Sequence, residues 1–219
     1  MYLPDHFRET RPEVVRAFVA SHPLATLIAN TGQGLIANHL PMLWRAATEG
    51  AGGAGVLRGH IARANTLWRQ AGQGSSVLTI FTGAQHYISP SWYPSKHVDG
   101  RVVPTWNYAS VQMRGHVRFI EDGAWLRALV DELTSIHERS QPTPWRLSDA
   151  PADYIEKMLR AIIGVEIEVT GVEAKFKGSQ NRAMADRRSV AAHLRAQGIG
   201  AESLSELAPG AELTPGAEP

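Results

Sequence analysis

The 219-residue sequence contains no cysteine. This absence excludes disulfide bonds, thiolate catalysis, zinc–thiolate sites and iron–sulfur clusters. The sequence also lacks an apolar run of roughly 18 residues, the length that a membrane-spanning helix needs. Its first residues lack the basic and apolar regions of a signal peptide. We therefore expect a soluble protein, and the missing cysteine fits a cytoplasmic location.

A strong charge of either sign is absent as well. Charged residues make up 20% of the chain and the net charge is +1, so a general electrostatic partner such as bulk nucleic acid or an anionic membrane is not indicated. The nine histidines show no pair at metal-ligand spacing, and we expect no metal site. Neither a nucleophile elbow nor a helix–turn–helix is visible. Hydrophobic residues, at 43%, suffice for a sizeable core.

The apolar periodicity predicts several strands joined by turns, with helices late in the chain. The predicted strands are 24–29, 35–44, 56–61, 76–81, 102–119 and a last one through 165–169. The predicted helices are 11–20, 62–70, 125–136 and 154–163, the last stopped by Gly164. This order indicates an α+β fold, a mainly antiparallel barrel with peripheral helices. We expect one domain over 1–195, a surface loop at 49–55, and a flexible tail over 196–219, which is rich in Gly, Pro, Ala and Glu.

The first segment with chemical character lies at 58–65, where a strand is predicted to lead into a helix. It contains Arg58, His60, Arg63 and Asn65. The start of a helix presents free N–H groups and partial positive charge, which suit a phosphate, and an arginine adds a fork of donors. The alternative is a capped helix with solvated arginines.

The second segment, 86–108, is rich in aromatic residues and proline. Its candidate binding residues are Trp92, Lys96, Trp106, Asn107 and Tyr108. Aromatic side chains beside an amide and an ammonium group are suited to enclose a planar ring system. A packed loop or a subunit interface explains the same composition equally well.

The third segment, 175–182, places a dense polar cluster after an apolar strand. Its candidate binding residues are Lys175, Ser179, Gln180, Asn181 and Arg182. A local excess of Lys and Arg over 171–195 is compatible with contact to a phosphate or to nucleic acid. The alternative is a helix start with Ser179 as its N-cap and a solvated basic face.

These segments belong to a set of seven blocks that identify a family. The blocks are MYLPDHF at 1–7, HPLATL at 22–27, ANHLP at 37–41, GHIARAN at 59–65, YISPSWY at 87–93, VPTWNY at 103–108 and SQNR at 179–182. In this order they resemble the PaiB-like FMN-binding negative transcriptional regulators, over residues 1 to about 195. The resemblance implies a flavin-binding split barrel that forms a homodimer with FMN sites at the subunit interface.

The resemblance also assigns roles to the three segments. It implies that 58–65 binds the FMN phosphate, and we infer from residue type that the other two segments approach the flavin ring, from the same or the partner subunit. It further implies a regulatory role in transcription, with DNA as a partner, and assigns no catalytic residue. Two alternatives remain open: a flavin-dependent oxidoreductase of the small flavin reductase type, and a haem-binding split barrel using His39, His60 or His86.

Overall fold

The computed structural model describes residues 1–47 and 54–210. The chain divides into two compact units, each built from separate stretches of sequence. The first unit comprises Met1–Phe18, Thr82–Val111 and Glu173–Pro219, and the second comprises Val19–Phe81 and Gln112–Val172. Three long strands, β6 to β8, contribute residues to both units. No helix in the described ranges has the length and apolar character needed to cross a membrane.

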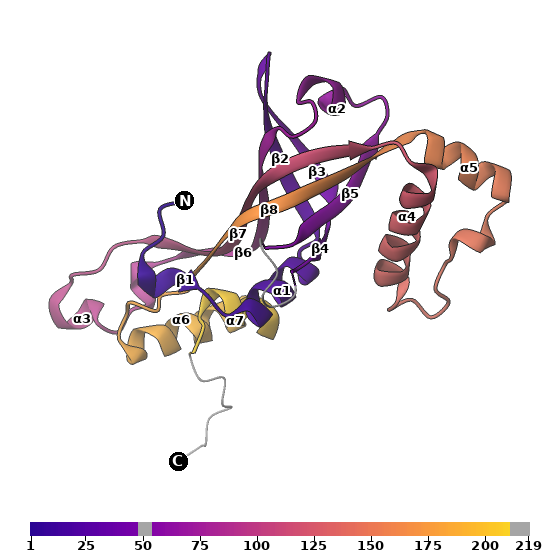
Figure 1. Ribbon diagram of the computed structural model, residues 1–219. Coiled ribbons are helices and arrows are strands. Elements are labelled where there is room, and N and C mark those ends of the chain that lie inside the picture. The colour runs from indigo at the N-terminus through magenta and orange to yellow at the C-terminus, as the bar shows by residue number, and fades with distance from the viewer. Residues whose placement is uncertain (48–53, 211–219) are drawn as a thin grey trace. The chain divides into compact units, whose positions relative to one another are not determined.

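The strands found in the described residues form one antiparallel sheet, labelled in Figure 1. Their hydrogen-bonded order is β3–β2–β6–β7–β8–β5–β4, and β1 pairs with β8. Their bounds are β1 Arg8–Glu9, β2 Leu24–Thr31, β3 Gly34–Pro41, β4 Leu43–Arg45, β5 Val56–Ala62, β6 Ser76–Ile88, β7 Thr105–Ile120 and β8 Ile162–Lys177. Strands β2, β5, β7 and β8 alternate buried and less buried residues over much of their length, as a sheet with one face on the core requires.

Within the second unit, the sheet curls until β5 approaches the end of β3. The two strands are not neighbours in the sheet order, yet a side chain at Gly59 in β5 would lie 2.7 Å from the Pro41 carbonyl oxygen. Only glycine permits backbones to approach so closely. This contact closes one side of the barrel that the periodicity predicts.

Two helices of the second unit pack on each other rather than standing alone. Helix α4 spans Gly123–Glu138 and α5 spans Ala152–Arg160, and they lie side by side in Figure 1. Leu126 of α4 packs with Ile155 and Leu159 of α5 in a buried cluster that Leu147 completes. The Asp122 carboxylate accepts a hydrogen bond from the Trp125 N–H and so caps α4. Burial of this apolar stripe is what holds the pair.

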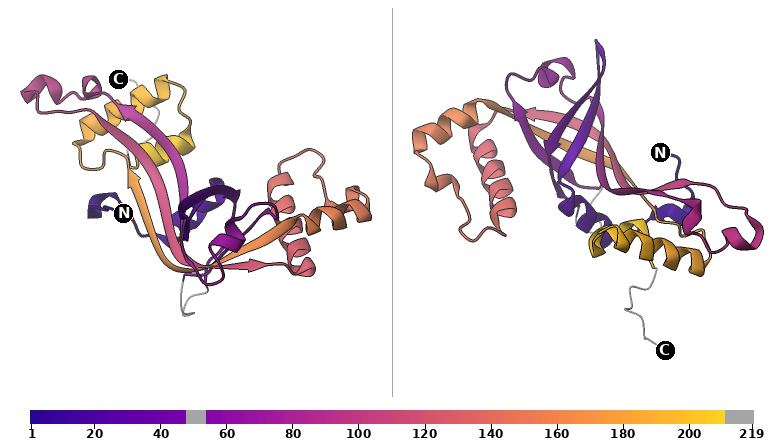
Figure 2. Two further views of the ribbon diagram at one scale, coloured as in Figure 1. Left: turned by 90° about the horizontal axis from the view of Figure 1, so that it is seen from above. Right: turned by 180° about the vertical axis from the view of Figure 1, so that it is seen from behind.

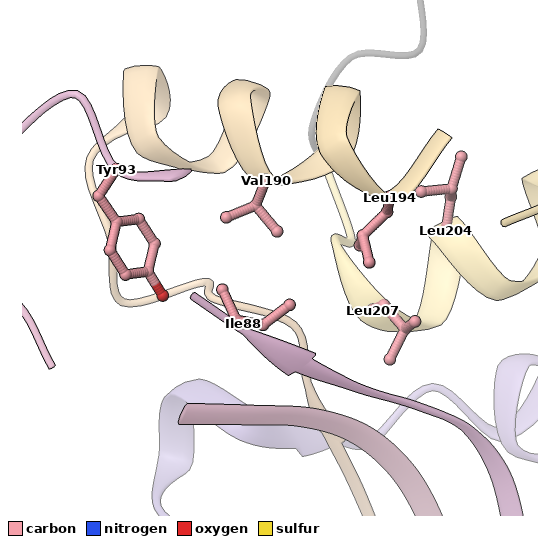
Figure 3. Packing of buried hydrophobic residues seen from close by; sticks show 6 residues of the cluster. All are labelled: Ile88, Tyr93, Val190, Leu194, Leu204 and Leu207. Carbon is pink, nitrogen blue, oxygen red and sulfur yellow. The ribbon is translucent and has the colours of Figure 1, made fainter. Parts of the chain in front are cut away.

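Two helices of the first unit, α6 Met184–Ala196 and α7 Ala201–Leu207, contribute most of a second apolar cluster. The other helical elements of the unit are η1 Asp5–Phe7, η2 Pro90–Trp92 and α3 Lys96–Asp99, while α1 Pro12–Ser21 begins in this unit. Figure 2 shows α6 and α7 next to each other in both views. In Figure 3, Val190 and Leu194 of α6 and Leu204 and Leu207 of α7 face Ile88 at the end of β6.

The structure confirms the strands and moves several helix boundaries. The predicted helix 62–70 is reduced to α2, Leu67–Gln70, because β5 continues through Ala62. The predicted helix 154–163 ends at Arg160, and Gly164 is not its stop: it lies in β8 opposite His60. A side chain at Gly164 would lie 2.3 Å from the Trp125 ring, so glycine is needed there for packing and not for helix termination.

The C-terminal part of the chain also differs from the expected flexible tail. Residues 196–210 include α7, and Leu204 and Leu207 are buried. The two leucines are three positions apart, so they share one helix face. Residues 211–219 of that expected tail, and most of the surface loop expected at 49–55, lie outside the described residues.

Candidate functional site

In the first unit, Asn107 joins three segments that are remote in sequence. Its side chain is fully buried in β7 and donates hydrogen bonds to the Ser179 hydroxyl, at 2.9 Å, and to the Leu207 carbonyl, at 2.8 Å. Its Oδ1 is buried without a hydrogen-bond partner in the described residues. Asn107 therefore fixes the turn after β8 and the end of α7 relative to β7, and Oδ1 retains an unused acceptor.

The turn after β8 is held by its own polar side chains. Ser179 is a non-glycine residue in the left-handed region, with φ 64°, a conformation that costs free energy unless its surroundings enforce it. The Gln180 amide accepts from the Gly178 N–H at 2.7 Å and donates to the Phe176 carbonyl. Ser179 is thus not the N-cap of a helix, because α6 begins only at Met184.

Next to this turn lie two lysines of β8, one of them over two tyrosine rings. We call this group the lysine–tyrosine cluster: Lys175, Lys177, Tyr2 and Tyr108. The Lys175 ammonium lies 5.4 Å from the centre of the Tyr108 ring and 5.5 Å from that of Tyr2, and it donates to the Tyr2 carbonyl at 3.0 Å. Lys177 donates to the Trp106 carbonyl at 2.7 Å and to the Thr105 hydroxyl. The cluster combines cations with π-systems, the pattern of a cation–π site.

The two lysines of this cluster have no carboxylate partner in the described part of the chain. All their contacts are to neutral acceptors or rings. Burial, together with the charge of Lys175, lowers the pKa of the Lys177 ammonium. Two adjacent cations that repel each other and lack a counter-ion favour the binding of an anionic or electron-rich group.

The side chains of the other predicted residues in the first unit make contacts outside this cluster. Trp106 is 54% exposed and its ring meets that of Tyr87 edge to face, 6.1 Å between centroids. Trp92 stacks between His86 and His193, at 6.0 and 5.1 Å.

Three predicted residues of this unit remain, and the first, Lys96, makes a long side-chain contact of 3.5 Å to the Ser91 hydroxyl. The Arg182 guanidinium lies over the buried Tyr93 ring at 4.8 Å. Asn181 is exposed. The structure therefore gives Arg182 a packing role and leaves the side chains of Lys96 and Asn181 near solvent.

In the second unit, the two predicted residues on β5 face α4. Arg58 and His60 are two positions apart, so they share a face of the strand. The Arg58 guanidinium donates to the Glu132 carboxylate of α4 at 2.6 Å, and Arg45 binds the same carboxylate. The charge of Arg58 is therefore shared with a carboxylate, although its Nε is buried without a partner among the described residues.

Arg63 and Asn65 lie beyond the end of β5 and fasten neighbouring segments. Arg63 donates to the Arg160 carbonyl at 2.8 Å, to Glu121 at 2.5 Å and to the Ile162 carbonyl at 3.5 Å. These bonds use three of the five N–H donors of a guanidinium. The Asn65 amide donates to Asn38 at 2.6 Å and accepts from the Leu67 N–H at 2.9 Å. The segment keeps free donors for a phosphate, but Glu121 is a competing anion.

The burial of His60 makes the folded protein less stable at acid pH. Burial lowers its pKa below the ordinary value of 6.5, so the unfolded chain takes up a proton at a higher pH than the folded protein does. The stability that His60 contributes in its neutral form is therefore fully present above about pH 6.5, and it is lost as the pH falls below that value. We expect His60→Leu to reduce the loss of unfolding free energy between about pH 7.5 and about pH 5.5, measured by urea denaturation. The exposed His116, changed to leucine, is the control; an equal reduction there would contradict the assignment.

The structure thus brings the predicted residues together in two groups, one in each unit. Sequence reasoning identified Asn107, Lys175 and Ser179 but did not single out Lys177, Tyr2 or the Leu207 carbonyl. Lys177 carried a signal, since residues two apart in a strand share one face and Lys175 was already a candidate. The roles of Tyr2 and Leu207 depend on contacts between chain ends and the sheet, which no local pattern reveals.

These features define a class before any comparison: an antiparallel barrel protein with a cationic and aromatic site suited to an anionic ring cofactor. Residues 1–171 match the protein family described as "Putative FMN-binding domain". The chain is 30% identical to the protease synthase and sporulation protein PAI 2 of Bacillus subtilis, over 94% of this chain and 96% of that protein. It is 32% identical to an uncharacterized protein of Emericella nidulans, over 87% and 88%. The chain therefore belongs to the PaiB-like FMN-binding family.

Comparison with solved structures supports the same fold. The chain resembles the FAD and haem binding protein of Mycobacterium smegmatis, with a TM-score of 0.54 and 16% identity over 77% of this chain and 72% of that one. It resembles the flavocytochrome Anf3 of Azotobacter vinelandii, with a TM-score of 0.56 and 15% identity over 77% and 68%. The expected α+β split barrel and FMN as the family's cofactor are confirmed. At these sequence identities, the two structures support the fold alone.

Proposed function

We propose that this protein is a regulatory flavoprotein of the PaiB type, a cytoplasmic homodimer whose FMN occupancy governs its action on transcription. The observation that carries the flavin part is the lysine–tyrosine cluster, where two cations have no carboxylate partner among the described residues and one of them lies over two tyrosine rings. The family membership and the Bacillus relative, a sporulation protein by its name, support the regulatory part.

In this proposal the candidates of the two units are assigned separately, those of the first unit to a flavin ring and those of the second unit to an FMN phosphate, in the same or the partner subunit. Lys175 and Lys177 bind the electron-rich edge of the flavin ring, and Tyr108 lies beside it. Arg63, with Arg58, His60 and Asn65 as neighbours, binds the phosphate through the guanidinium donors that its bonds to Glu121 and to two backbone carbonyls leave unused in the described residues. The remaining candidates are assigned to the edge of the ring site: Trp92, Lys96, Trp106, Asn107, Ser179, Gln180, Asn181 and Arg182. FMN, when bound, supplies one- and two-electron redox chemistry, whereas the protein supplies orientation and charge.

The direct experiment is a titration of the purified protein with FMN, followed by the visible absorbance and fluorescence of the flavin. Saturable changes in the flavin spectrum support the proposal, and a spectrum identical to that of free FMN at every ratio contradicts it. The regulatory part needs a separate test: DNA fragments upstream of the gene are compared for mobility shifts with FMN-loaded and FMN-free protein. A shift that is equal with random DNA, and lost alike at moderate salt, contradicts sequence-specific regulation.

The phosphate assignment predicts a selective effect of Arg63→Ala. Loss of a charged hydrogen bond costs about 1.5–3 kcal/mol, so we expect FMN to bind about tenfold to a hundredfold more weakly. Riboflavin, which lacks the phosphate, should keep its affinity. Equal losses for both ligands would show that Arg63 acts by holding Arg160 and Glu121 in place. Unfolding free energies, measured in parallel, separate lost affinity from lost structure.

A further inference from the structure

A cavity of about 240 Å³ lies in the second unit, between the α4–α5 pair and the sheet. His60 of β5, Val130 of α4 and Ile162 of β8 line it, together with Trp145, Tyr154 and Met158 near α5. Figure 1 shows the labelled elements α4, α5, β5 and β8 that contribute these side chains. Trp145, Tyr154 and Met158 are large apolar residues that remain partly exposed. The cavity is therefore an apolar hollow with an aromatic rim.

His60 contributes an imidazole ring to the lining. Its Nδ1 is buried and makes no hydrogen bond within residues 1–47 and 54–210. Because Nδ1 has almost no accessible surface, a ligand in the cavity reaches the ring at its other nitrogen, Nε2. A neutral imidazole nitrogen donates or accepts according to the tautomer, and a hydroxyl group satisfies it in either case.

The chemistry of the lining excludes a charged ligand. None of the described residues that line the cavity carries a permanent charge, and burial keeps the His60 pKa low and the ring neutral near pH 7. Arg58, on the same face of β5, is already bound to Glu132. Transfer of a phosphate or carboxylate into such a site costs far more than one hydrogen bond returns. The cavity is thus unsuited to the phosphate of FMN, which the proposed function assigns to the Arg63 guanidinium beyond the end of β5, outside the lining.

The size of the cavity limits the ligand further. An apolar cavity of 150 Å³ in another protein accepts benzene, and 240 Å³ leaves room for one or two fused rings. A flat ring in the cavity would also cover surface of Trp145 and Tyr154 that is now exposed, which is favourable at about 25 cal/mol per Å². We propose that this cavity binds a small uncharged aromatic molecule bearing one hydroxyl group, which bonds to Nε2 of His60.

The test uses full-length protein and two probes that differ only in the hydroxyl group, 1-naphthol and naphthalene. Binding is measured by isothermal titration calorimetry on FMN-free and FMN-saturated protein. We expect saturable binding in both forms, with 1-naphthol tighter than naphthalene by about threefold to tenfold, as one hydrogen bond provides. His60→Leu should abolish this preference while naphthalene still binds. His116→Leu, the same change at an exposed site, should preserve it.

A second variant keeps the test decisive if His60→Leu fails to fold. Met158 lies at the partly exposed rim, so Met158→Trp should fill the cavity with little effect on the fold and weaken both probes at least tenfold. Absence of saturable binding, or binding that Met158→Trp leaves unchanged, overturns the proposal. Displacement of 1-naphthol by FMN also overturns it, because the cavity would then be part of the flavin site. The FMN-free arm is independent of whether FMN binds at all.

Discussion

Replacement of both Leu204 and Leu207 by alanine is expected to lower the free energy of unfolding by about 4 kcal/mol or more. Each removes a buried leucine, a change that typically costs about 2–5 kcal/mol through lost transfer free energy and the cavity left behind. The two side chains belong to one cluster with Ile88, Val190 and Leu194 (Figure 3), so their effects need not add exactly. Urea denaturation followed by circular dichroism measures the loss.

The double variant also tests whether α7 belongs to the folded part of the chain. Helix α7 supplies the Leu207 carbonyl to Asn107 and the Glu206 carboxylate to the Ala84 N–H, at 2.8 Å each. If α7 were a loosely attached tail, the two substitutions would change stability by no more than a few tenths of a kcal/mol. Glu202→Ala, at an exposed position of the same helix, is the matched control for any effect on helix propensity alone.

The strands could be predicted because their alternation of apolar and polar residues is visible within a few neighbouring positions. The hairpin of β2 and β3 pairs Thr31 with Gly34, where two strand-like runs flank a glycine-containing turn. The boundary between α5 and β8 was missed because Ile162 and Ile163 satisfy a helical stripe and a buried strand equally well. The pairing of Ile162 with Ala62 places Ile162 in a strand, and Ala62 lies a hundred positions away in the sequence.

The candidate site was predictable in its residue types and not in its contacts. The resemblance placed Lys175, Ser179 and Asn107 in one site, and the structure joins the last two directly. The segment 58–65 is different, because half of its candidates turn toward α4. Arg58 looked like a free cation in the sequence, yet Glu132, 74 residues later, neutralises it. Charge compensation of this kind depends on the packing of a distant helix, which no motif encodes.

The two groups of cations are expected to affect a bound flavin differently, because only one group is paired with carboxylates among the described residues. Arg58 and Arg63 each lie beside a carboxylate, whereas Lys175 and Lys177 do not in the described chain. A cation without a counter-ion stabilises negative charge on a ligand most strongly, because no competing anion has to be displaced. The lysine–tyrosine cluster is therefore where loss of charge should most affect the flavin itself.

We accordingly expect the double variant Lys175→Met/Lys177→Met to weaken FMN and riboflavin alike, by about tenfold to a hundredfold. Both ligands share the ring, and the two ammonium groups are assigned to its edge. The reduced ring carries more negative charge than the oxidised one, so its binding should weaken more. The reduction potential of the bound flavin should then become more negative, by about 30 mV for each 1.4 kcal/mol of difference in a two-electron couple. Fluorescence titration and a redox titration measure the two effects.

The control for this prediction is Lys157→Met, an exposed lysine of α5 in the other unit. A loss of affinity for FMN with riboflavin unchanged would move the phosphate, and not the ring, to the lysine–tyrosine cluster. Unchanged affinity and potential would remove the cluster from the flavin site altogether. Methionine preserves most of the length and apolar stem of lysine, so folding should survive because the Lys175 and Lys177 stems pack while only their charged ends are lost. The potential is the sharper readout, since a purely structural role of the lysines would lower affinity without favouring the oxidised flavin.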